Sequence, residues 1–165
     1  MKDSLNKVIA ALREELEQYG EMLARLDEQQ EYAMRRAAGE LLMSVGSVRE
    51  QGERVGSARA QRELAQSELS EECALSKDAP FAQIIPRLPE NYRPLVLALT
   101  QENNELLVRV QQRARQNHLL LLRSLELMTS LINSLFPGAA TPVYTDSGGI
   151  LNRNLPRRPV YEALG

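Results

Sequence analysis

The side chains that most often carry acid-base or nucleophilic chemistry are nearly absent from this 165-residue chain. His118 is the only imidazole and Cys73 the only thiol. The chain has no phosphate-binding loop, dinucleotide fingerprint, H-E-x-x-H or G-x-S-x-G motif. Carboxylate pairs such as Glu14–Glu15 and Glu71–Glu72 are adjacent, so on a helix they point apart rather than form a two-carboxylate site. We therefore expect no enzyme, no catalytic residue and no bound cofactor.

A metal site and a disulfide are disfavoured by the same scarcity. One thiol and one imidazole cannot form a zinc site from Cys and His alone, and Cys73 has no partner within the chain. A single thiol with no N-terminal export signal indicates a cytoplasmic protein.

Charge and hydropathy exclude two classes of partner. The chain has 20 basic and 22 acidic residues and a net charge of −2, whereas nucleic-acid binders need basic residues to neutralise phosphates. The most apolar stretch, residues 119–136, is interrupted by Arg123 and Glu126, so it is not an insertion segment. We expect neither nucleic-acid binding nor membrane insertion.

The composition predicts long helices, because Leu, Ala, Glu, Arg and Lys fill about half of the positions. The first segment has apolar residues at alternating spacings of three and four, as in the seam of a coiled coil. This seam comprises Leu5, Ile9, Leu12, Leu16, Tyr19, Leu23, Leu26, Gln30, Ala33 and Ala37. The charged positions around it, Arg13, Glu14, Glu15, Glu17, Glu21 and Glu28, are interpreted as a solvated face.

The second segment repeats this spacing less faithfully. Its predicted seam comprises Leu41, Val45, Val48, Gly52, Val55, Arg59, Arg62, Gln66 and Leu69. Gly39, Gly46, Gly52 and Gly56 weaken the helix; Gly52 and Ala58 mark either a close helix approach or a loose helix. We place the turn between the first two segments at Arg36 to Gly39. Four prolines then end the second helix, and a short helical turn at 79–85 is expected to cover the bundle end with Phe81, Ile84 and Ile85.

The third long segment runs from about Pro94 to Phe136. Its predicted packing face comprises Val96, Leu99, Asn103, Leu106, Val110, Ala114, Asn117, Leu121, Leu125, Met128, Ile132 and Leu135. Asn103 and Asn117 fall on this face, where a polar residue usually sets helix register rather than doing chemistry.

Excess hydrophobicity near the end of the third segment is the candidate binding feature. Leu120, Leu127 and Leu131 form a second stripe, which widens the apolar arc to about 200°. Either this end packs against both other helices, or it forms a groove for an amphipathic helix of a partner. In the second case Met22, Met34, Met43 and Met128 supply adaptable surface. An up-down-up bundle would bring Met34, Leu42 and Met43 beside the stripe.

Three parts of the chain resemble the FlgN-type flagellar export chaperones. They are the opening LNKVIAALREELEQYGEMLARLDEQQE, the helix end LLLLRSLELMTSLINSLF and the tail element TPVYTDSGG, and the resemblance covers about residues 1–149. It implies a cytosolic bacterial chaperone that binds the C-terminal helices of hook-associated proteins and delivers them to the type III export gate. It also implies that Tyr144 contacts the gate, with a turn-packing tyrosine as the alternative.

We therefore predict an all-α fold: an elongated antiparallel three-helix coiled-coil bundle with a short connector helix and an irregular C-terminal tail. The helical chaperone domain is placed at 1–136, with helices at about 3–36, 40–71 and 94–136 and a connector at 73–93; the flexible tail is 137–165. Client binding is assigned to Leu120, Leu127, Met128, Leu131, Met34 and Met43. The state is expected to be a monomer or weak dimer. The alternative function is a coiled-coil adaptor or oligomerising scaffold without a client.

Overall fold

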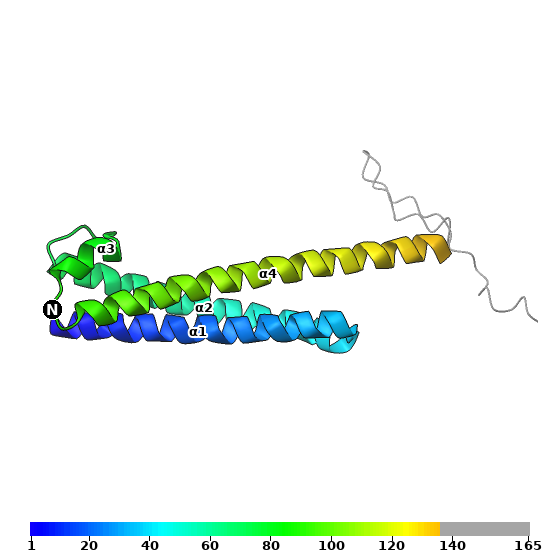
Figure 1. The fold of residues 1–165 in the computed structure, drawn as a ribbon, viewed down its shortest axis with the longest axis horizontal. Helices are drawn as coiled ribbons and strands as arrows, with labels where there is room; N and C mark the ends of the chain where they lie inside the picture. The colour runs from blue at the N-terminus through cyan, green and yellow to red at the C-terminus, as the bar shows by residue number, and fades with distance from the viewer. Residues whose placement is uncertain (136–165) are drawn as a thin grey trace, which may run out of the picture. The chain divides into compact units, whose positions relative to one another are not determined.

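The computed structural model describes residues 1–135, and these are helical with no strand among them. The elements are α1 (Lys2–Arg35), α2 (Ala38–Glu72), α3 (Phe81–Ile84), the 3-10 turn η1 (Ile85–Arg87) and α4 (Arg93–Leu135) (Figure 1). The all-α prediction is confirmed. The chain divides into two compact units, Met1–Leu120 and Leu121–Gly165, and α4 contributes to both.

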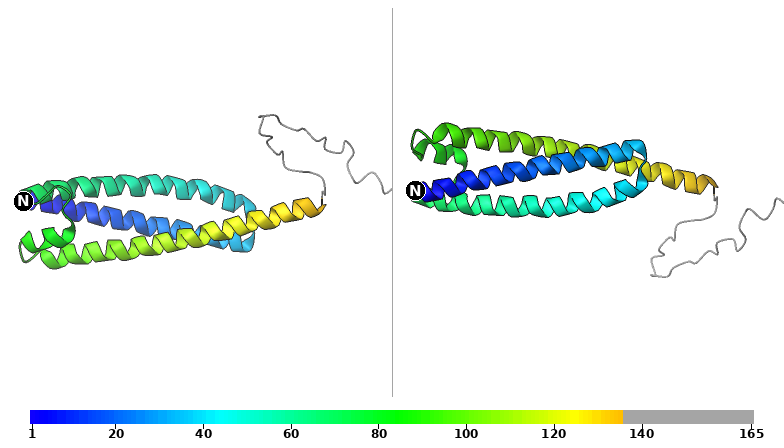
Figure 2. Two further views of the ribbon diagram at one scale, coloured as in Figure 1. Left: turned by 90° about the horizontal axis from the view of Figure 1, so that it is seen from above. Right: turned by 90° about the horizontal axis from the view of Figure 1, so that it is seen from below.

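Within Met1–Leu120 the three long helices run side by side, up, down and up (Figure 2). The buried core lies at the end where α1 begins, and α3 and η1 cover it. Its largest fully buried side chains include Leu5, Leu12, Leu69, Ile84 and Leu88. Phe81 and Ile85 pack against the same core, which confirms the predicted role of the connector.

The predicted seam of α1 is confirmed, since none of its ten positions is exposed. A second row on α1 is also buried, at seven-residue spacing: Val8, Glu15, Met22 and Gln29. Two expectations were wrong here, because Glu15 is 3% exposed rather than solvated and Met22 is 9% exposed rather than part of a binding surface. Each lies one position before a residue of the predicted seam, Leu16 or Leu23, on the side of α1 that α2 covers.

The predicted seam of α2 is largely wrong. Of its nine positions only Leu69 is buried, whereas a row of small or polar residues is buried instead: Ser44, Gln51, Ala58 and Ala65. These four residues are seven apart and therefore follow one face of the helix. Small side chains let α2 approach α1 closely, and the two backbones are near each other along their length. Gly52 is exposed, and a Cβ at this position would meet only the Met22 side chain of α1 at 3.8 Å, an ordinary contact, so the approach does not require glycine here.

The turn between α1 and α2 lies where it was predicted. Arg36 adopts the left-handed conformation, with φ of 56°. The N–H of Ala37 donates to the carbonyl of Tyr32, and the N–H of Arg36 donates to that of Ala33. These two bonds form a Schellman motif, which usually places glycine at the left-handed position. Ala74 repeats the motif after α2, also with φ of 56°.

Two asparagines join α4 to α1. The side-chain Nδ2 of Asn103 donates to the carbonyl of Leu12 at 2.9 Å, and that of Asn117 donates to the carbonyl of Leu26 at 2.7 Å. Both pairs are 91 residues apart, so α1 and α4 are parallel and in constant register. Both asparagines are buried on the packing face of α4, which agrees with the structural role predicted for them.

Candidate functional site

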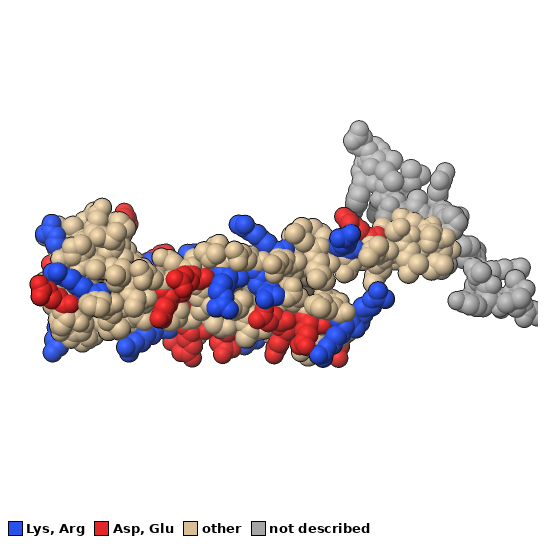
Figure 3. Space-filling view, in the orientation of Figure 1, with Lys and Arg blue, Asp and Glu red and all other residues tan. Residues whose placement is uncertain are grey.

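The last turns of α4 are apolar and exposed. The described part of the unit Leu121–Gly165 is this helix alone, residues 121–135, and no second helix among those described residues covers it. Leu127 is 67% exposed, Met128 61% and Leu131 57%. Arg123 and Glu126 are the only charged residues in this stretch, and Figure 3 shows a surface almost free of charge over the end of the helix.

The exposed surface is wider than the predicted second stripe. The packing face was expected to stay covered up to Leu135, and this expectation is wrong: Leu125, Met128, Ile132 and Leu135 are all exposed. Together with Leu120, Leu121, Leu127 and Leu131 they span about 160° of the helix at 100° per residue. We call these eight residues the α4 arc. Leu120 and Leu121 are half-buried within it.

The arc is a broad apolar face, interrupted by Ser124, of the kind that can bind another helix. Glu126, Ser130 and Asn133 lie on the opposite side, together with the exposed Leu119 and Leu122, so the exposed apolar surface of this helix end is not limited to the arc. Soluble monomers rarely expose a contiguous apolar patch larger than a few hundred Å² unless it binds something. The arc can bury an apolar face of a partner, and its methionine can adapt to the shape of that face.

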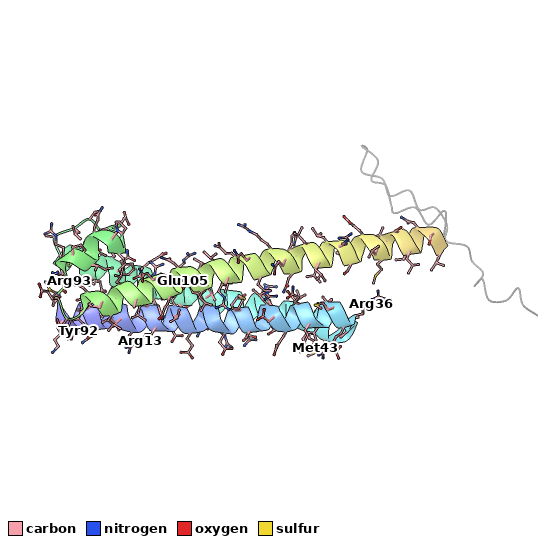
Figure 4. All side chains as sticks on the ribbon, in the orientation of Figure 1. Arg13, Arg36, Met43, Tyr92, Arg93 and Glu105 are labelled. Atoms are coloured by element: carbon pink, nitrogen blue, oxygen red, sulfur yellow. The ribbon has the colours of Figure 1, made fainter. Side chains whose placement is uncertain are left out.

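The other predicted binding residues lie at the α1–α2 turn. Met34 is 70% exposed at the end of α1, and Met43 is 78% exposed in the first turns of α2 (Figure 4). Leu42, 76% exposed, lies beside Met43. These three residues belong to the unit Met1–Leu120, whereas most of the arc belongs to the other unit. The predicted adjacency of the two sets therefore stays a prediction.

Tyr144, the predicted export-gate contact, lies outside the described residues. So does the whole predicted tail, 137–165.

The polar interior has a structural arrangement rather than a catalytic one. The buried Glu15 carboxylate accepts hydrogen bonds from Arg62 and from the Tyr19 hydroxyl, each at 3.0 Å. Burial, and next the charge of Glu15, raise the pKa of Tyr19 to about 12. Glu15 is thus held between a cation and a neutral phenol, which satisfies its charge and ties α1 to α2.

Cys73 lies in the core at the end of α2. Burial, with a smaller contribution from Glu72, raises the pKa of its thiol, which makes it a poor nucleophile. His118, at a border of the packing face, is exposed. Within residues 1–135 no cluster of three or more His, Cys, Asp or Glu side chains could hold a metal ion. No helix in this range is long and apolar enough to cross a membrane.

An exposed apolar face on a long helix is the kind of surface that an amphipathic helix of a partner can bind. The family model described as FlgN protein matches residues 1–152. The chain therefore belongs to the FlgN family, whose members are flagellar type III export chaperones for hook-associated proteins. No curated protein and no solved structure matches the chain.

Proposed function

We propose that this chain binds the C-terminal helical region of hook-associated proteins in the cytoplasm, prevents their premature assembly and delivers them to the type III export gate. Family membership supports chaperone activity in flagellar export. The observation that carries the assignment of the binding site is the exposed α4 arc. An exported helix that later packs in a filament has an apolar face, and the arc offers that face a temporary partner.

The client-binding residues in this proposal are Leu120, Leu127, Met128 and Leu131 on α4, with Met34 and Met43 at the α1–α2 turn. The export-gate contact is Tyr144. The chain acts by binding, without catalysis and without a cofactor.

The mechanism follows from mass action. A helix bound to the arc is unavailable for assembly, and the fraction protected rises with the ratio of free chaperone to Kd. Apolar contact without a buried charge network also permits release, because no buried ion pair must be broken at the gate.

The proposal is tested by co-expression of the full chain with a hook-associated protein. We expect one stable stoichiometric complex and slower polymerisation of the hook-associated protein. A constitutive homodimer that buries the arc and binds no hook-associated protein would instead support the scaffold function.

The role of Tyr144 is tested separately. Tyr144→Ala should leave client binding unchanged and reduce secretion of the hook-associated protein in cells. Unchanged secretion would contradict the assignment.

A further inference from the structure

A groove lies between α2 and α4, within the unit Met1–Leu120. Its volume is about 500 Å³. α1 forms the floor with Leu12, Glu15 and Tyr19, and α3 contributes Phe81 at one end. The walls are Arg59, Arg62 and Gln66 from α2, and Leu97, Asn104 and Leu107 from α4.

The groove exists because α1 has two neighbours, α2 and α4, whose backbones stand apart from each other. α2 lies close to α1 through its buried row of small or polar residues, whereas the backbone of α4 stands further from both helices. α4 is held to α1 by the two asparagines and by Arg113, whose Nε lies 2.8 Å from Asp27. No hydrogen bond or ion pair joins residues 38–72 to residues 93–119.

The α4 wall and the α3 end of the groove have apolar side chains that no other helix covers completely. Leu97 is 45% exposed and Phe81 is only half-buried. On α2 the predicted seam lies on the groove side, since Arg59, Arg62 and Gln66 belong to it and line the groove. Its apolar members further along, among them Val45, Val48 and Val55, are half-buried or exposed. An apolar seam without a helix against it indicates a vacant fourth-helix position.

The charges at the groove favour an acidic occupant. Glu15 is already paired with Arg62 at 3.0 Å, whereas Arg59 lies 4.0 Å from Glu15 and 3.9 Å from Glu63 and is half exposed. The donors of Arg59 are therefore available at the rim. On α4, residues 106–125 include four arginines and no acidic residue. One of them, Arg115, is exposed and lies three turns after Asn104 on the same face.

We propose that this groove binds a second helical segment of the exported client, amphipathic and with acidic residues beside its apolar face, and so completes a four-helix bundle. The inference rests on the proposed function, because it assigns the groove to the same client. The α4 arc and the groove are then two separate contacts, one apolar and one partly electrostatic.

The experiment measures binding of a purified hook-associated protein to the full chain by titration calorimetry at low and high salt. Arg59→Gln should weaken binding three- to tenfold at low salt, and the difference from the wild type should shrink at high salt because ions screen the contact. Arg54→Gln is the matched control, since Arg54 is similarly exposed on α2 but lines the opposite side, near Glu14 and Gln18. It should bind as the wild type does.

Leu97→Gln tests the apolar wall independently of charge. It should also weaken binding several-fold while thermal melting of the free chain stays unchanged. The inference is overturned if Arg59→Gln and Leu97→Gln both bind as the wild type does while Leu127→Asp abolishes binding; the proposed function would survive that result. Failure of the wild-type chain to bind would reject both.

Two other results would also overturn the inference. An equal loss of binding in Arg54→Gln would show a nonspecific charge effect. A client-free dimer that Leu97→Gln converts to a monomer would show that a second copy of the chain occupies the groove.

Discussion

Replacing Leu127 with aspartate separates a binding role for the α4 arc from a structural one. Leu127 is 67% exposed, and full burial of a leucine contributes about 1.5–3 kcal/mol. Covering this side chain with a client helix therefore contributes about 1–2 kcal/mol. The aspartate loses that contribution and must also be desolvated, which costs at least about 1–2 kcal/mol more. We expect the Kd for a hook-associated protein to rise about 30- to 1,000-fold.

The fold should tolerate the same substitution. A side chain this exposed makes few contacts within the chain, so the free energy of unfolding should change by about 0.5–1 kcal/mol. Ser130→Asp is the matched control: it adds the same charge to the same turns of α4 but on the side opposite the arc. Calorimetry gives the Kd, and circular dichroism gives helicity and the melting temperature.

Cooperative unfolding of Leu127→Asp at a much lower temperature would contradict a binding role for Leu127, because it would show that this side chain is part of the core. Equal weakening by Ser130→Asp would also refute it, because the effect would then come from charge alone.

Three further predictions concern the bundle. Asn117→Ala should lower the free energy of unfolding by about 1–3 kcal/mol in urea titrations, because it removes the bond to Leu26 and leaves the Oε1 of buried Gln29 without its donor; an unchanged midpoint would show that the asparagine is dispensable. Arg36→Gly should raise that free energy by about 1 kcal/mol, because glycine adopts φ of 56° without strain, and Ala74→Gly should act in the same direction; a loss in both would contradict the motif. Between pH 10 and 12 the free energy of unfolding of the wild type should fall by about 2–3 kcal/mol relative to that of Tyr19→Phe. The reason is that the phenol deprotonates near pH 10 in the unfolded chain, whereas in the folded chain, where its pKa is about 12, it keeps its proton. Parallel plots of unfolding free energy against pH for the two proteins would exclude a raised pKa.

Much of the bundle could be predicted from the sequence because heptad spacing directly reports a buried helix face. The seam of α1, the turn at Arg36 and the inward positions of Asn103 and Asn117 all follow from that spacing. The connector followed from the prolines that end α2 and from the cluster of Phe81, Ile84 and Ile85.

The face of α2 that contacts α1 was missed because the prediction looked for apolar residues. The contact needs close approach, so small or polar residues at seven-residue spacing from Ser44 to Ala65 were the informative signal. The burial of Glu15 was missed for a related reason, since a carboxylate among other charged residues is usually solvated. Its position seven residues from Val8 and Met22 was the available clue.

The candidate site could be predicted in part. Leu127 and Leu131 are exposed as a binding stripe requires, but the packing face of α4 was expected to remain buried to its end. Residues 121–135 continue the same apolar pattern after the buried Asn117, and a pattern of apolar residues does not tell whether the partner is in the same chain. The exposure of these residues in the structure shows that no described helix of the same chain covers them.

Amide hydrogen exchange, compared between the free chain and its complex with a hook-associated protein, tests the role of the α4 arc most directly. Client binding to the arc should slow exchange strongly in residues 119–135. Unchanged exchange in those residues, with protection confined to α1 and α2, would contradict it.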